Sequence, residues 1–332
     1  RGRPFDGKAP FADMDTVSLD HLILAKLRRA IALNRVPGYH FCGNFLDLRF
    51  EDVRKGHALV SLRASPQLTE VGGRIHPSAF AVLADFAMAS AIRTADDPAT
   101  RLATVSINLQ WTGAQALEFL NANGKLLGFH REAKGRLGQS TVQIYSEQGL
   151  VASGLGSFMV LPAPSDKKLS PIAWINQPAP EAPDLLPDTL LNADESQILQ
   201  HGLDCLARCE GSGTDPSEHF FEHFLNQGFE PNAQGCQGVL PNGPHLGNRV
   251  GHVQGGITLG FGMASAQASL GESWRLSTLN AAFISPGQGH QLSSNTSITH
   301  QGKYTAAAHT HIYSHDGDMV LELLSTHVRS KL

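Results

Sequence analysis

The sequence has little charge, few cysteines and no long apolar run, and each absence excludes a class of protein. Charged residues make up 17% of the 332 residues and the formal net charge is −4, so no basic surface favours nucleic acid or an anionic membrane. No apolar run approaches the roughly 18 residues needed to cross a bilayer. The first residues, Arg1 to Asp6, lack the apolar core of a signal peptide. We therefore expect a cytoplasmic protein that binds neither nucleic acid nor a membrane.

Four cysteines are too few for a disulfide framework in a chain of this length. Two of them are four residues apart and would share a helix face, but no thiol or imidazole stands at a spacing typical of a metal site. We interpret all four as buried free thiols in a reducing compartment: Cys42, Cys205, Cys209 and Cys236.

Histidine is frequent, with 16 residues spread over the chain. His309 and His311 lie two apart on an expected strand, so they share one face and could chelate a metal ion. Chance pairs are expected at this abundance, and a solvated strand face is the simpler interpretation. We expect no metal site.

Proline is concentrated in one stretch. Seven of the chain's 18 prolines lie between Pro162 and Pro187. Proline fixes φ and removes a hydrogen-bond donor, so this stretch is typical of an extended linker. We predict an N-terminal domain over residues 1–163 that includes an arm and a helix, a linker over 164–187, and a C-terminal domain over 188–332.

The two halves repeat each other. Three short matches occur in the same order and at nearly the same offset: Met88–Ala91 with Met263–Ala266, Arg101–Thr104 with Arg275–Thr278, and Ile144–Gly149 with Ile312–Gly317. Each match alone is weak, but three in order indicate an internal duplication. A period of this length means two copies of a domain.

Apolar periodicity predicts the same elements in each half. An amphipathic helix is expected over Leu19–Leu33, and a helix that is apolar on nearly every face over Pro77–Ile92. Strands are expected around 45–50 and 58–62 and near 103–111, 125–132, 139–146 and 150–160. The second half repeats this order with helices near 195–208 and 217–226, an apolar helix over Gly255–Ser269, and strands from Arg275 onward. This α+β pattern predicts an antiparallel sheet wrapped around one central helix in each half, the two sheets joining edge to edge.

Common catalytic motifs are missing, but two features suggest chemistry. Asp85 lies inside the apolar helix, where an ionised carboxylate without a partner is costly. A carboxylate at the helix edge that reaches solvent is the alternative.

The second feature is the segment Asn248–Gly256, whose last two residues, Gly255 and Gly256, begin the second apolar helix. Bare backbone N–H groups at a helix start favour negative charge and suit a developing oxyanion. A turn that simply requires glycine explains the segment equally well.

These residues resemble the hotdog-fold acyl-CoA thioesterases of the phenylacetate-pathway type, which carry an Asn-x-x-Gly-x-x-His-Gly-Gly loop before the central helix. Asn248, Gly251, Gly255 and Gly256 match that loop, and Gln254 stands where His is usual. In the first half, Gly73 and His76 match the loop and Asp85 falls at the family's acidic position. There Glu70 replaces the Asn, and Pro77 and Ser78 replace the glycines.

The resemblance implies a tandem double hotdog with one composite site. The family builds each site from the loop of one unit and the acid of the other. The second half has Met263 or Gly260 at its acidic position, depending on the alignment, and neither is a carboxylate. One site therefore pairs the loop over Asn248–Gly256 with Asp85, and the other lacks an acid.

The expected activity is hydrolysis of an acyl-CoA thioester, with CoA as part of the substrate and no cofactor. Asp85 would act as general base or nucleophile, Gly255 or Gly256 would hold the oxyanion, and Asn248 and Gln254 would orient water or the carbonyl. Thr104 follows the first helix at a position where the family often has a hydroxyl, and is a candidate to orient Asp85; packing in a strand is its alternative role. A homodimer of the whole chain is also expected.

Two other functions stay open. Loss of motif residues in the first half fits an acyl-CoA-binding or regulatory module without turnover. A hydratase or dehydratase of acyl thioesters is the third possibility, but the Asp-then-His segment typical of those enzymes does not follow Asp85.

Overall fold

The computed structural model describes residues 19–36, 40–96, 100–132, 135–162 and 183–330. The predicted N-terminal arm and residues 164–182 of the predicted linker lie outside the described residues. The domain boundaries that depend on them stay predictions.

Twelve strands form one continuous sheet within the described residues, and every neighbouring pair is antiparallel. The first half contributes β1 (Arg49–Arg54), β2 (His57–Arg63), β5 (Arg101–Trp111), β6 (Phe119–Glu132), β7 (Gly135–Ser146) and β8 (Gly149–Leu161). The second half contributes β9 (Gly228–Asn232), β10 (Gly235–Pro241), β11 (Trp274–Phe283), β12 (Gln291–Gln301), β13 (Thr305–Ser314) and β14 (Met319–Arg329). A separate two-stranded hairpin joins β3 (Thr69–Glu70) to β4 (Arg74–Ile75).

The two halves meet at the centre of the sheet, where β5 pairs with β11. The strand order is β1-β2-β6-β7-β8-β5-β11-β14-β13-β12-β10-β9. Leu279 lies opposite Leu109, and Ala281 opposite Ile107. Pairing these edges buries the unpaired backbone groups that each half would otherwise expose.

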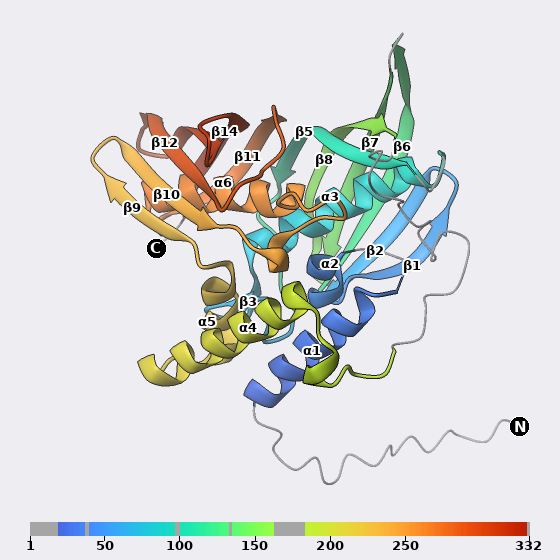
Figure 1. Cartoon of the computed structure of the whole chain (residues 1–332). Helices are drawn as coiled ribbons and strands as arrows, with labels where there is room; N and C mark the ends of the chain where they lie inside the picture. The colour runs from blue at the N-terminus through green and yellow to red at the C-terminus, as the bar shows by residue number, and fades with distance from the viewer. Residues whose placement is uncertain (1–18, 37–39, 97–99, 133–134, 163–182, 331–332) are drawn as a thin grey trace, which may run out of the picture.

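One apolar helix lies against each half of the sheet, α3 (Pro77–Arg93) against the first and α6 (Gly255–Leu270) against the second (Figure 1). Proline at the first turn and the His76 side chain, which accepts from the Ser78 N–H at 3.1 Å, begin α3. Leu83 and Met88 of α3 are fully buried, and burying a side chain of this size contributes about 1.5–3 kcal/mol. The predicted double hotdog is confirmed.

The two central helices touch backbone to backbone because small residues lie at their crossing. A Cβ added at Gly256 would lie 2.5 Å from Cα of Val82, and one at Gly260 would lie 2.5 Å from Cα of Ser78. Any larger side chain at these glycines would push the helices apart. The pairing also shows that α3 and α6 run antiparallel at this contact.

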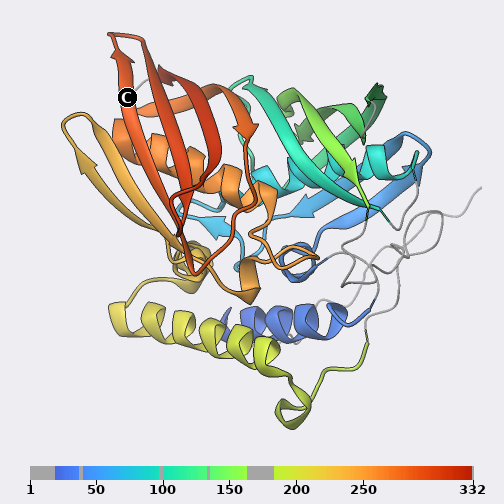
Figure 2. The same ribbon diagram turned by 45° about the horizontal axis from the view of Figure 1, so that its top comes forward.

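A layer of helices covers one end of the sheets (Figures 1 and 2). It consists of α1 (Leu19–Leu33), α2 (Phe41–Phe45), α4 (Ala193–Ser212) and α5 (Pro216–Leu225). Figure 2 shows α1 and α4 side by side, and Arg35 after α1 makes a bidentate ion pair with Glu195 of α4 at 2.7 and 2.6 Å. Rings of α2 and α5 form a shared cluster around Phe45 and Phe224, whose centroids are 4.7 Å apart.

One expected strand is wrong at its start. The segment around 45–50 begins as the end of α2, and β1 starts only at Arg49. Phe45 is buried in the aromatic cluster with α5, a contact from a distant part of the chain that local alternation does not reveal.

The four cysteines are free and buried, as predicted. Among the described helices, none combines the length and apolarity that a bilayer span requires.

Candidate functional site

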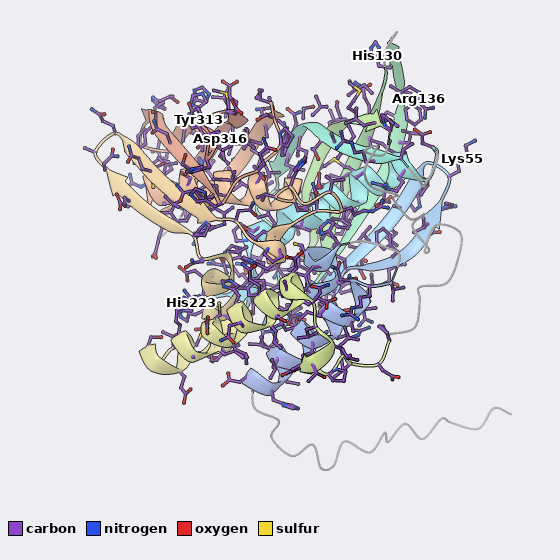
Figure 3. The ribbon with its side chains drawn as sticks, viewed as in Figure 1. Lys55, His130, Arg136, His223, Tyr313 and Asp316 are labelled. Atoms are coloured by element: carbon purple, nitrogen blue, oxygen red, sulfur yellow. The ribbon has the colours of Figure 1, made fainter. Side chains whose placement is uncertain are left out.

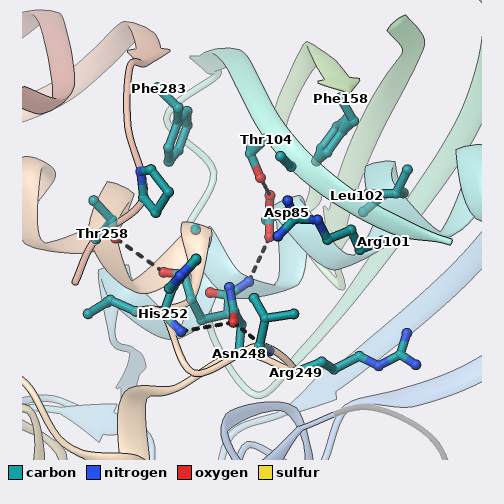
Figure 4. Close-up of a pocket in the computed structure, with 18 of the residues that line it drawn as sticks. Asp85, Arg101, Leu102, Thr104, Phe158, Asn248, Arg249, His252, Thr258 and Phe283 are labelled. Carbon is teal, nitrogen blue, oxygen red and sulfur yellow. Dashed lines mark hydrogen bonds between the residues drawn. The ribbon is translucent and has the colours of Figure 1, made fainter. Parts of the chain in front are cut away.

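Asp85 lies in the middle of α3, facing the start of α6. Its Oδ1 accepts a hydrogen bond from Thr104 Oγ1 at 3.0 Å, and its Oδ2 accepts one from Gln254 Nε2 at 2.6 Å. Figure 4 shows both interactions beside the cavity. Three segments therefore converge on one carboxylate: helix α3, strand β5 and the loop before α6.

Asp85 is only 6% exposed. Burial raises the pKa of Asp85 to about 6, while the hydrogen bonds from Thr104 and Gln254 act in the opposite direction. The group is thus ionised at neutral pH and still basic enough to take a proton from water.

Gln254 holds its place because both ends of its amide are used. Its Oε1 accepts from the Ile257 N–H at 3.0 Å, which makes Gln254 the N-cap of α6. This bond assigns the amide nitrogen to the other side, where it donates to Asp85. The cap and the carboxylate contact therefore fix each other.

Asn248 organises the loop that leads to Gln254. Its Oδ1 accepts from the N–H groups of Val250 and His252 at 3.0 and 3.1 Å. Gly251, between them, has a φ of 88°, a left-handed conformation that favours glycine. Asn248 lines the cavity, but its side-chain oxygen is used to shape the loop.

The two glycines at the start of α6 have different surroundings. A Cβ at Gly255 would lie 2.9 Å from Thr104 Oγ1 and 3.6 Å from both carboxylate oxygens of Asp85, whereas a Cβ at Gly256 would meet the backbone of α3. Gly255 lines the cavity and Gly256 does not. Neither backbone N–H, that of Gly255 or that of Gly256, donates a hydrogen bond to any of the described residues. These groups point out of the positive end of the helix dipole.

A cavity of about 340 Å³ opens beside these groups. One part of its wall is apolar and includes Phe86, Phe158 and Phe283. Three arginines also line it, Arg93, Arg101 and Arg249, while Asp85 is the only acidic residue among the described lining residues. The site is therefore shaped for a ligand with an apolar part and negative charge.

The sequence did not single out these arginines. Arg249 follows Asn248 in the glycine-rich loop before α6. Figure 4 shows its side chain extending away from Asp85. His40 also lines the cavity, from the residue before α2. Burial, together with Arg249 and Arg93, lowers the pKa of His40 to about 3 and keeps this ring neutral.

The predicted site residues are largely brought together. Asp85, Thr104, Gln254 and Gly255 meet at the cavity. Gly256 instead serves the helix crossing. The roles of these residues in a reaction remain predictions.

The contacts between α3 and α6 show which residue of the second half corresponds to Asp85. Gly256 lies against Val82 and Ser78 lies against Gly260, so the two contacts occupy equivalent places in the two halves. Counted from the caps Gln254 and His76, this relation makes Met263 the counterpart of Asp85. Met263 is buried, and this half has no carboxylate at the corresponding position.

Thr278 does not repeat the role of Thr104. Its hydroxyl pairs with that of Thr326 on β14 at 2.6 Å. The register of β5 shifts between Thr104 and Ser106, and that of β11 between Leu276 and Thr278. These shifts fall at different places relative to the two threonines, so their side chains face differently.

Solved structures with a similar fold include two proteins assigned as thioesterases and one described as having a hotdog fold. A protein assigned as a thioesterase from Novosphingobium aromaticivorans has a TM-score of 0.53 and 12% identity, and the match covers 86% of this chain and 98% of that chain. A protein assigned as an oleoyl thioesterase from Lactobacillus plantarum has a TM-score of 0.50 and 8% identity, covering 84% and 97%. A protein of unknown function with a hotdog fold from Alicyclobacillus acidocaldarius has a TM-score of 0.50 and 8% identity, covering 86% and 96%.

These likenesses confirm the expected hotdog fold, and at this low identity they show the fold alone. No protein-family model and no curated protein sequence matches the chain.

Proposed function

We propose that this double hotdog protein hydrolyses an acyl-CoA thioester in the cavity beside Asp85. The observation that carries the proposal is the buried carboxylate held by Thr104 and Gln254 next to the N-terminus of α6. A base and an oxyanion-binding helix end then face the same space, which is what acyl transfer to water requires.

Asp85 supplies the base or the nucleophile. Each of its oxygens accepts one protein hydrogen bond and retains a lone pair for water or for the thioester carbon. With a pKa of about 6, the carboxylate is ionised at neutral pH. Thr104 and Gln254 hold it in one orientation, so little reorganisation accompanies the reaction.

The N–H of Gly255 binds the thioester oxygen. Gly255 begins α6, so the helix dipole adds to the hydrogen bond as negative charge develops on that oxygen. The lack of a side chain at Gly255 leaves room for the thioester beside Thr104 and Asp85.

The other walls of the cavity suit the two ends of an acyl-CoA. The aromatic and aliphatic lining accepts the acyl chain, and the guanidinium groups of Arg93, Arg101 and Arg249 bind the CoA phosphates. No cofactor is needed, because water is the second substrate.

Release of free CoA is the test. The full chain is incubated with acyl-CoAs of increasing chain length, and liberated thiol is followed with a thiol reagent. We expect turnover by the wild type and by Met263→Leu, which alters the counterpart of Asp85, but not by Asp85→Asn.

Two outcomes would replace this function with another. Tight binding of acyl-CoA without thiol release by the wild type would favour a binding module. Addition of water to an enoyl-CoA with the thioester intact would favour a hydratase.

A further inference from the structure

A group of metal-ligating side chains lies on the outer face of the second half of the sheet, away from α6. Along β13 the even-numbered residues from Ala306 to Ser314 are buried against the core side, and the odd-numbered residues face outward. His309 and His311 are therefore on the outer face, as is Tyr313, which Figure 3 labels over this part of the sheet. The sequence revealed the two histidines but no third ligand.

The third ligand comes from the neighbouring strand. In the β13–β14 register His311 lies directly opposite Glu322. His309 Nε2 is 2.8 Å and His311 Nε2 is 3.8 Å from Glu322 Oε1. The three ligand atoms all lie within 4.8 Å of one another, and it is the only such group of three found among the described residues.

Glu322 has no basic partner that would explain its position otherwise. Within the described part of the chain, its ion-pair partners are His309 and His311 alone. On its other side β11 places Ala282 opposite it. A carboxylate between two imidazoles, without lysine or arginine, leaves negative charge for a cation to neutralise.

We propose that His309, His311 and Glu322 bind a divalent first-row transition-metal ion, with Zn²⁺ the best match. Two imidazole nitrogens and one carboxylate oxygen are a donor set that Zn²⁺ prefers. Tetrahedral coordination with ligand bonds near 2.0–2.2 Å sets ligand atoms about 3.3–3.6 Å apart. The present separations need only small side-chain rotations, which the exposure of the side chains, 27, 29 and 44%, leaves room for. Water completes the fourth position.

This site is separate from the cavity of the proposed function. The outward-facing residues of β13 and β14 lie across the sheet from the residues that pack on α6. Bound metal would link β13 to β14 and stabilise the folded chain by mass action. It would take no part in hydrolysis.

Zinc uptake by the untagged full-length chain tests the proposal. Binding is measured by equilibrium dialysis against Zn²⁺ and by competition with a chromogenic chelator. We expect one equivalent for the wild type, and at least about tenfold weaker binding for Glu322→Gln and for His309→Ala, because each removes a ligand. Zinc should raise the unfolding temperature of the wild type but not that of Glu322→Gln.

The chain offers a matched control. His290 and His315 form another close surface pair, with ring centroids 3.5 Å apart, but no described carboxylate, histidine or cysteine joins them in such a group. The double variant His290→Ala/His315→Ala should bind zinc as the wild type does. If the wild type takes up no zinc, or if Glu322→Gln and His309→Ala bind it unchanged, the group is a hydrogen-bonded surface cluster and the proposal is wrong.

Discussion

The two ends of the crossed pair α3 and α6 have the same backbone packing, but only one of them has a carboxylate. At one end the cap Gln254 is followed by Gly256, which lies against Val82. At the other, the cap His76 is followed by Ser78, which lies against Gly260. The packing is thus duplicated, while the carboxylate exists only once. Packing constrains both copies, because a poor fit at either crossing would destabilise the whole chain, whereas one reactive group is enough for a reaction.

The loops before the two helices also differ in what covers them. The first-half loop lies against α5: the rings of His76 and Phe221 meet edge to face at 5.1 Å, and Thr69 Oγ1 donates to the Ser217 carbonyl at 2.6 Å. Burial lowers the pKa of His76 to about 4 and keeps it neutral. The second-half loop borders the open cavity instead. The first-half loop is therefore covered by α5, whereas the second-half loop is open to the cavity.

Removing the carboxylate should have the largest effect. Asp85→Asn is expected to lower kcat by ~10²- to 10³-fold, because loss of a base or of charge stabilisation typically costs this much. Met263→Leu at the related position should leave kcat unchanged. Thiol release from an acyl-CoA measures both, and a wild-type rate for Asp85→Asn would end the one-site account.

The pH profile should carry the signature of the same group. Burial raises the pKa of Asp85 to about 6, so the active carboxylate is lost as pH falls below this value. We expect kcat/KM to drop about tenfold per pH unit there and to be flat above it.

The stability of the fold should change with pH in the opposite direction to the rate. The pKa of Asp85 is higher in the folded state than in the unfolded chain, so protonation of Asp85 favours the folded state. Its contribution to the free energy of unfolding is therefore lost as pH rises through about 6. Asp85→Asn should therefore be no less stable than the wild type at pH 8 in urea unfolding. For the rate, a pH profile of kcat/KM that does not fall below about pH 6 would exclude Asp85 from the rate-limiting chemistry.

Thr104→Val should have an intermediate effect. The hydroxyl stabilises the ionised form of Asp85, so its loss should shift the pH midpoint upward. It should lower kcat by about tenfold, because a hydrogen bond to a charged group is worth about 1.5 kcal/mol at the low end. Thr278→Val removes a hydroxyl that pairs with Thr326 and should move neither quantity. An unchanged midpoint in Thr104→Val would show that packing alone explains this residue.

The duplicated crossing predicts equal losses of stability. Gly256→Ala and Gly260→Ala each place a Cβ 2.5 Å from a backbone atom of α3, and overpacking of this kind costs about 1–3 kcal/mol. Denaturant unfolding should give similar decreases for both. A loss in only one of them would mean that the helices can separate at the other.

The smallest change in rate should follow from altering the first-half loop. His76→Ala removes a helix cap worth about 1 kcal/mol, and Glu70→Gln weakens an ion pair with Arg74 whose atoms are 2.9 Å apart. Neither touches the cavity, so kcat should be close to wild type in both. A larger loss of kcat in His76→Ala than in Asp85→Asn would reassign the site to the first half.

Apolar periodicity predicts the bounds of a helix well where the helix depends on its own residues alone. The helix expected over 19–33 has the observed bounds of α1, and the apolar helices expected over 77–92 and 255–269 differ from α3 and α6 by one residue at their C-terminal ends. Periodicity and capping residues act within a few turns, so sequence alone suffices there. The same reasoning failed near Phe45, whose environment is supplied by α5.

For the site, apolar periodicity and the spacing of the glycines are enough to predict a carboxylate inside one apolar helix and a glycine-rich loop before another. Contacts between distant segments, in contrast, make Gln254 donate to Asp85 across 169 positions and turn Thr104, but not Thr278, toward the helices. The same contacts make Met263 the counterpart of Asp85 and bring Glu322 to the two histidines. Each of these depends on strand register or on the helix crossing. Both are set by contacts between distant segments, which local sequence patterns do not encode.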